Sequence, residues 1–251
     1  MATFARSGDL RGAEFAGADL RGARFVEADL SGVVMRGVRV AGVDIDAPWL
    51  DEDEASLRIN GVDVIPLVEA ELNRRFPGRA GRRSRDPDGL RAAWVALEGN
   101  WSAAIDRVAA LPAGTAVVSV GAEWSFAQTL RHLVLATDLW LGQAILGIEQ
   151  PFHPVGLVGG GSEDSFDMSV FTATTPPYSE VLEVRTGRVA MVRDFLAAVT
   201  ADELAVPRTN PHDPGHPETT RSCLHVILEE EWEHLRYALR DLDAIASAAA
   251  H

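Results

Sequence analysis

The sequence predicts a mainly α protein, in which a four-helix bundle follows a short repetitive segment. After residue 85, long stretches carry apolar residues at helical spacing, and Gly- and Pro-rich segments separate them. Before residue 48, an apolar residue recurs at every fifth position instead. We therefore expect three parts: a repeat over 1–47, a connecting segment over 48–85 and a helical domain over 86–251.

The repeat begins at Asp9 and reads DLRGA EFAGA DLRGA RFVEA DLSGV VMRGV RVAGV DIDAP. Its recurring large residues are Leu10, Phe15, Leu20, Phe25, Leu30, Met35, Val40 and Ile45. This pattern resembles the pentapeptide repeat, in which each pentad forms one side of a right-handed quadrilateral β-solenoid. Eight pentads would make about two coils, and so short a solenoid buries little apolar surface by itself. We expect it to depend on packing against the domain that follows.

Some pentapeptide-repeat proteins imitate DNA through their acidity. Here residues 9–46 hold seven acidic residues against five arginines, a net charge of −2. That charge is small, so the sequence favours a structural role for the repeat.

The connecting segment should contain a strand over 57–64 and a helix over 66–76. Pro77 and Gly78 end that helix, because Pro cannot continue it and Gly favours a helix terminus. Four arginines follow within seven residues, at Arg79, Arg82, Arg83 and Arg85. We interpret them as a solvated turn that forms salt bridges with the acidic remainder of the chain.

Four longer helices are expected over 86–111, 125–147, 178–199 and 222–243. Ser125 is a suitable N-cap for the second of them. Long loops connect the second helix to the third and the third to the fourth, and loops of that length in a compact domain are often functional. Four long helices joined in part by long loops predict a four-helix bundle, where sites are built from side chains on facing helices.

The last helix carries a Glu and a His one turn apart. Glu230 and His234 are four residues apart, so both can reach one metal ion, although such a pair is more often an ordinary ion pair. His132 lies among leucines on the second predicted helix and offers a third ligand. Three ligands from two helices would leave a coordination place open, as catalytic metal sites require.

Two motifs around these residues resemble the DinB-like superfamily, which includes thiol-dependent S-transferases and the mycothiol-dependent maleylpyruvate isomerase. They are TLRHLVLATDLWL (129–141) and LEEEWEHLRYALRDLDA (228–244), and the likeness covers about 86–248. It implies a bundle that binds a divalent metal through His132, Glu230 and His234, and the ExxxH spacing points to the isomerase-like branch. Zinc is the favoured metal, with nickel, manganese or iron as alternatives.

The resemblance also implies that the metal activates a low-molecular-weight thiol for transfer to, or isomerisation of, a small electrophile. All basic residues are arginines, and this GC-rich composition, similar to that of actinobacterial proteins, favours mycothiol. The competing interpretation is a non-catalytic metal-binding stress or interaction protein whose pentapeptide coil binds a partner. The sequence does not indicate the substrate, and it leaves a homodimer open.

Several further residues are candidates for the pocket around this site: Cys223, Tyr237, Glu231, Asp138 and His153. Glu231 is also an alternative to Glu230 as the metal ligand, because it points nearer the centre of the apolar stripe of its helix. Cys223 lies two turns before Glu230 on the same edge, at the expected mouth of the site. A small buried hydrophobic residue is, however, the more common role for a single Cys.

Composition and charge narrow the classes of protein to which this chain could belong. The formal charge of −14 argues against a nucleic-acid binder that uses a basic face. No apolar run approaches the ~20 residues that span a bilayer, and MATFARSGDL lacks the apolar core of a signal peptide. The single Cys suits a reducing compartment, so we expect a cytoplasmic protein without nucleic-acid or membrane partners.

Overall fold

The computed structural model describes residues 10–26, 28–50, 55–160 and 162–249. The chain forms two compact units, Met1–Asp46 and Ala47–His251, which are described separately.

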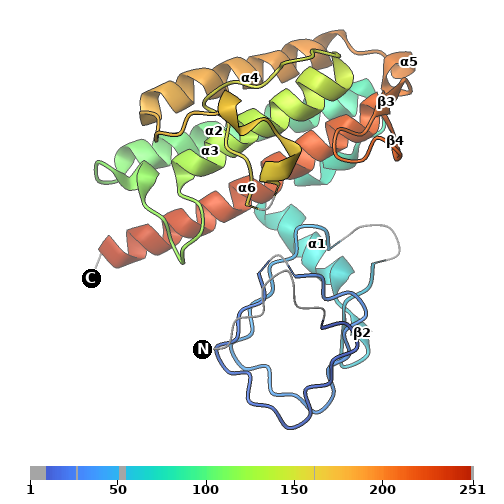
Figure 1. Cartoon of the computed structure of the whole chain (residues 1–251), viewed down its shortest axis with the longest axis vertical. Helices are drawn as coiled ribbons and strands as arrows, with labels where there is room; N and C mark the ends of the chain where they lie inside the picture. Colours follow the sequence, from blue (N-terminus) through green and yellow to red (C-terminus); the bar gives the residue numbers. More distant parts are fainter. Residues whose placement is uncertain (1–9, 27, 51–54, 161, 250–251) are drawn as a thin grey trace. The chain divides into compact units, whose positions relative to one another are not determined.

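The first unit winds as square coils (Figure 1), as the repeat predicts. Tight turns recur every ten residues. The N–H groups of Ala13, Ala23, Val33 and Val43 each donate to the carbonyl three residues earlier, at 2.9–3.1 Å. The third residue of each turn is a Gly with φ of 73–74°, in the left-handed region. A type II turn requires this conformation at that position, which explains the Gly of the repeat.

The apolar residues of the coils are poorly covered. Leu10, Phe15, Leu20, Phe25 and Leu30 are 45–62% exposed. No β-strand is formed by the described residues from 10 to 46, and every one of them is exposed. Two coils therefore follow the solenoid path without providing a buried interior.

The second unit is mainly helical. Its elements are β1 (Arg58–Ile59), β2 (Val62–Asp63), α1 (Ile65–Arg75), η1 (Arg79–Arg83), α2 (Pro87–Ala110), η2 (Thr115–Val117), α3 (Phe126–Thr137), η3 (Asp138–Ile145), η4 (Glu163–Ser165), η5 (Met168–Val170), α4 (Tyr178–Ala198), α5 (Ala201–Leu204), β3 (Pro207–Thr209), β4 (Pro217–Thr219) and α6 (Thr220–Ala249). Among the described residues, no helix is long and apolar enough to cross a membrane.

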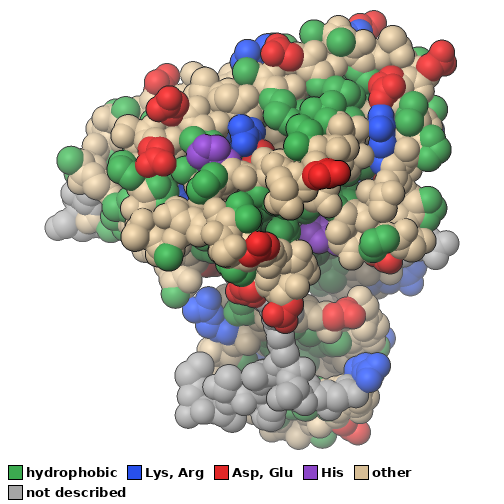
Figure 2. All heavy atoms as spheres, turned by 45° about the horizontal axis from the view of Figure 1, so that its top comes forward, with side chains coloured by type: hydrophobic (Ala, Val, Ile, Leu, Met, Phe, Trp, Pro, Cys, Tyr) green, Lys and Arg blue, Asp and Glu red, His purple; other side chains and the backbone are tan. Residues whose placement is uncertain are grey.

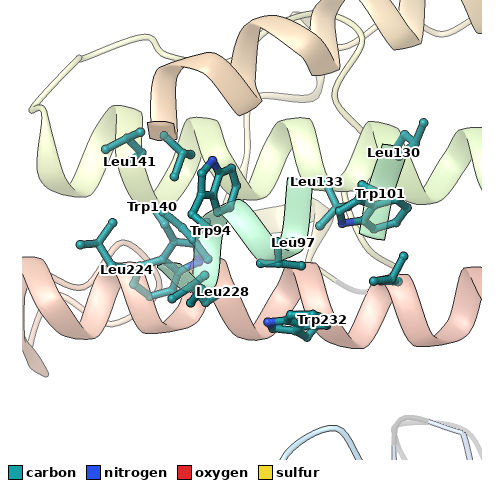
Figure 3. Close-up of a cluster of buried hydrophobic side chains, with 14 of the residues drawn as sticks. Trp94, Leu97, Trp101, Leu130, Leu133, Trp140, Leu141, Leu224, Leu228 and Trp232 are labelled. Atoms are coloured by element: carbon teal, nitrogen blue, oxygen red, sulfur yellow. The ribbon is translucent and has the colours of Figure 1, made fainter. Parts of the chain in front are cut away.

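Four of these helices form the predicted bundle. α2 packs against α4 and α6, and α3 packs against the same two helices. Figure 1 shows the four lying alongside one another. Large side chains of α2, such as Trp94 and Trp101, meet leucines of α3 and α6 in the core (Figure 3). On the face in Figure 2, acidic and basic side chains are interspersed with apolar ones.

The second predicted helix changes its winding partway along. α3 ends at Thr137 and continues as the π-helix η3, in which the N–H of Leu146 donates to the carbonyl of Leu141, five residues back, at 2.9 Å. The helix continues along the chain without a break, but the side chains beyond Thr137 no longer follow the α-helical register.

Three predictions for the connections are corrected. The strand expected over 57–64 is a hairpin, because Asn60 (φ 51°) and Gly61 (φ 82°) form a turn between β1 and β2. The loop before α6 contains a second hairpin, β3–β4. α6 begins before the predicted Ser222, since the Thr219 and Ser222 side chains each accept a hydrogen bond from the other's backbone N–H, as in a capping box.

The arginine cluster after α1 forms the predicted salt bridges, but only part of it is solvated. Arg79 and Arg82 are buried, and both bind the carboxylate of Glu69 on α1 at 2.9 Å. Arg82 also donates from Nε to Glu229 on α6, at 2.9 Å. A buried guanidinium needs a carboxylate partner, so these pairs fasten α1 and η1 to the bundle.

Candidate metal centre

α3 fixes the position of His132. The helix starts with a capping box, in which Ser125 accepts from the backbone N–H of Gln128 and the Gln128 side chain accepts from that of Ser125. Nδ1 of His132 lies 3.1 Å from the carbonyl oxygen of Leu157. A proton on Nδ1 donates to that carbonyl, which leaves Nε2 as the atom available to a ligand or metal.

α6 brings Glu230 and His234 to the same place. Oε2 of Glu230 lies 3.4 Å from Nε2 of His132 and 3.2 Å from Nε2 of His234. One ligand atom from each of the three residues lies within 4.8 Å of the other two. The structure therefore joins the three side chains that the sequence selected as metal ligands.

The donor set suits a divalent metal. Tetrahedral zinc with bonds of about 2.0–2.1 Å has its ligand atoms about 3.3 Å apart, and the two Nε2–Oε2 distances are 3.4 and 3.2 Å. The same distances also suit hydrogen bonds from protonated histidines to a carboxylate. No fourth His, Cys, Asp or Glu of the described residues joins the group. Two imidazoles and one carboxylate would thus leave coordination places open.

The electrostatics favour an ionised Glu230. Burial raises the pKa of this carboxyl, but hydrogen bonds and charge from His132 and His234 outweigh burial and hold it well below its ordinary value. The carboxylate is therefore charged, as a metal ligand must be.

Each acidic residue of the crowded motif on α6 has a different partner. Glu229 binds Arg82, Glu233 binds Arg236 at 2.7 Å, and Glu231 binds Arg185 of α4 at 2.5 Å. Only Glu230 faces the two histidines. The alternative assignment of Glu231 as ligand has no support in this geometry, because its carboxylate lies in the core against α4.

Sequence reasoning missed the aromatic wall of the site. The indole of Trp124 lies nearly parallel to the His234 ring, with centroids 5.8 Å apart, and its centroid is 4.8 Å from that of His132. Trp124 precedes the N-cap of α3, and no helical periodicity marks such a residue. Tyr237, a predicted pocket residue, does lie at the site, with its ring edge-on to His234 at 5.8 Å.

The loop after η3 closes another side of the site. Arg131 donates to the carbonyl of Val155 at 2.8 Å, and the N–H of Leu157 donates to the carbonyl of Arg131 at 3.3 Å. A Cβ added at Gly159 would lie 3.8 Å from Trp124 and 4.0 Å from His132. The loop thus passes close beside the cluster, and an alanine at 159 would make ordinary van der Waals contact with both rings.

Other predicted pocket residues lie elsewhere. Cys223 is fully buried in the bundle core rather than at the mouth of the site, and burial raises its pKa to about 12. Asp138 is buried too, where it binds Arg188 and accepts from the N–H of His153 at 2.9 Å. Burial raises the pKa of Asp138 more than Arg188 lowers it. The carboxylate of Asp138 is therefore held by Arg188 and by the backbone of His153.

Fold and site together define a four-helix bundle with a His–Glu–His cluster between two of its helices. The chain belongs to the DinB superfamily, whose profile matches residues 96–238. Pentapeptide repeats match in eight copies over residues 6–44. Both agree with the resemblance drawn from the motifs. No curated protein and no solved structure gave a match.

Proposed function

We propose that this bundle is a metal-dependent enzyme that activates a low-molecular-weight thiol for transfer to, or isomerisation of, a small electrophile. The observation that carries the proposal is the three-ligand cluster with partly exposed members. The side chains of His132, Glu230 and His234 are 18%, 28% and 15% exposed. A structural metal site is closed by four protein ligands, whereas a catalytic site keeps a place open toward solvent.

A divalent metal bound by these residues would lower the pKa of a thiol presented to it. Neighbouring residues of the chain supply the other parts of the site. The carbonyl of Leu157 orients the His132 ring, and Trp124 covers both imidazoles on one side. Tyr237 places a hydroxyl-bearing ring beside His234, and the guanidinium of Arg236 lies 4.5 Å from the centre of that ring. These groups would exclude water and orient an electrophile.

Mycothiol is the favoured thiol on compositional grounds. The chain uses Arg for every basic residue, and this GC-rich composition is similar to that of actinobacterial proteins. Zinc is the favoured metal, since two imidazoles and a carboxylate match its preferences. Nickel, manganese and iron remain alternatives.

The test begins with the metal content of the purified protein by mass spectrometry, where about one divalent ion per chain is expected. His132→Ala, Glu230→Gln and His234→Ala should each deplete it, because three ligands leave no spare. His225→Gln is the matched control, since His225 lies on α6 but binds the carbonyl of Ser84 at 2.8 Å, away from the cluster. Unchanged metal content in all three ligand variants would refute the assignment.

Thiol chemistry is measured separately, as conjugation of monochlorobimane by mycothiol, glutathione or cysteine. We expect metal-dependent turnover that is fastest with mycothiol and absent in the ligand variants. Metal binding without turnover by any thiol would instead support a second candidate, a non-catalytic metal-binding protein that uses its pentapeptide coil for partner binding. The half-exposed apolar residues of the coil are the observation that favours this candidate.

A further inference from the structure

The bundle contains a cavity whose lining includes none of His132, Glu230 and His234. It occupies about 320 Å³ between α2 and α4, which falls at the lower end of small-molecule pockets. Its apolar walls include Trp94, Leu97 and Trp101 of α2 and Leu182 and Val189 of α4. Glu231, not Glu230, reaches it from α6, so the two neighbouring carboxylates serve different spaces.

The polar group in this cavity is the guanidinium of Arg185. Its side chain is 4% exposed, and its Nη2 binds both carboxylate oxygens of Glu231 at 2.5 Å. Nε and Nη1 are buried and have no acceptor among the described residues. Trp94 also lines the cavity, and its buried Nε1 likewise lacks an acceptor there. Buried donors left unsatisfied are costly, so the cavity calls for an acceptor.

Charge decides what kind of acceptor fits. Arg185 is already neutralised by Glu231, and the other charged pair of the lining, Arg193 with Glu98 at 2.5 Å, is neutral as well. A carboxylate ligand would add an unbalanced negative charge beside Glu231, which is unfavourable in a buried space. A carbonyl oxygen would accept from the free N–H groups without adding charge.

Entry is available from the solvent side. Ser102 of α2 and Thr186 of α4 line the cavity and are exposed, as is Arg193. The cavity therefore combines an open rim, aromatic and aliphatic walls and a donor group at its buried end.

From this arrangement we propose that the cavity between α2 and α4 binds a small, uncharged, largely apolar molecule through a carbonyl-type acceptor placed on Arg185. The site is independent of the metal cluster and of the thiol chemistry proposed above.

Acetophenone, an uncharged aryl ketone, serves as the probe in calorimetric titration of the full chain. Ethylbenzene lacks the acceptor, and benzoate carries a charge. We expect acetophenone to bind about tenfold or more tightly than ethylbenzene, as loss of a hydrogen bond to a charged donor implies, and more tightly than benzoate. Equal affinity for ethylbenzene, tighter binding of benzoate, or no binding of acetophenone would overturn the proposal.

Variants locate the site. Ser102→Phe should fill the rim and abolish binding, whereas Ala103→Phe, at the next and exposed position of α2, should not. The double variant Arg185→Met/Glu231→Met replaces the ion pair with apolar side chains and should lose the preference for the ketone. His132→Ala should leave ketone binding intact, which separates this site from the metal cluster. Equal binding by Ser102→Phe and Ala103→Phe would place the probe elsewhere and refute the site.

Discussion

Replacing Glu230 and Glu231 separately by Gln should produce opposite results. In Glu231→Gln, Arg185 keeps its charge but loses its carboxylate in a place where the two side chains are 4% and 2% exposed. Breaking a buried ion pair by removing one partner costs about 3–5 kcal/mol. For a domain of this size each kcal/mol lowers the melting temperature by about 2–4 °C, so we expect a fall of roughly 6–20 °C.

Glu230→Gln should behave differently, because Glu230 is 28% exposed and a Gln at this position can still accept a hydrogen bond from either imidazole. We expect a loss of about 1 kcal/mol or less, together with loss of bound metal. Melting is followed by circular dichroism in the presence of a chelator, because bound metal would itself stabilise the folded state. Metal content is measured on the same preparations without the chelator.

The reasoning fails if Glu231→Gln melts within about 2 °C of the unmodified protein, since the ion pair would then not be buried as described. It also fails if Glu231→Gln loses metal while Glu230→Gln retains it, which would reverse the assignment of the two carboxylates.

Three further predictions concern other parts of the chain. Cys223, whose pKa burial raises to about 12, should not react with Ellman's reagent at neutral pH until the protein is unfolded; rapid reaction of the native protein would contradict its burial. Burial and nearby arginines lower the pKa of His225 despite its hydrogen bond to Ser84, so the unfolded chain takes up this proton first. Stability should then be full above about pH 6.5 and decrease as pH falls below it. His225→Gln should flatten that decrease in denaturant titrations at several pH values, and an unchanged slope would exclude His225 as its source. A peptide of residues 1–50 should show no cooperative melt by circular dichroism, because every described residue from 10 to 46 is exposed; a sharp transition would show that the coil folds independently.

The sequence was sufficient to predict the bundle and the proximity of His132, Glu230 and His234, for physical reasons. Helical apolar periodicity and caps such as Ser125 are local signals, and they located the helices to within a few residues. The spacing of Glu230 and His234 is also local, since four residues on a helix share one face. The contribution of His132 needed the motif on α3 in addition, because its meeting with α6 is a tertiary contact.

What the sequence did not reveal depends on partners distant in the chain. Glu231 pointed toward the centre of the apolar stripe, and only the structure shows that Arg185 of α4 balances it there. The burial of Arg79 and Arg82 likewise depends on Glu69 and Glu229. Trp124 lies in a loop without periodicity, so its position against the histidines could not be derived locally.

The π-helical stretch of η3 makes the chain tolerant of a change in length at that point. A π-helical turn accommodates more residues than an α-helical turn, as though residues had been inserted into an α-helix. Deleting one residue within Asp138–Ile145 would let this stretch return to α-helical winding, so the change in length is absorbed there. The segment from Ser125 to His132 precedes this stretch and would keep its register. Related chains should therefore differ in length after Thr137, while the spacing between the N-cap and His132 stays constant.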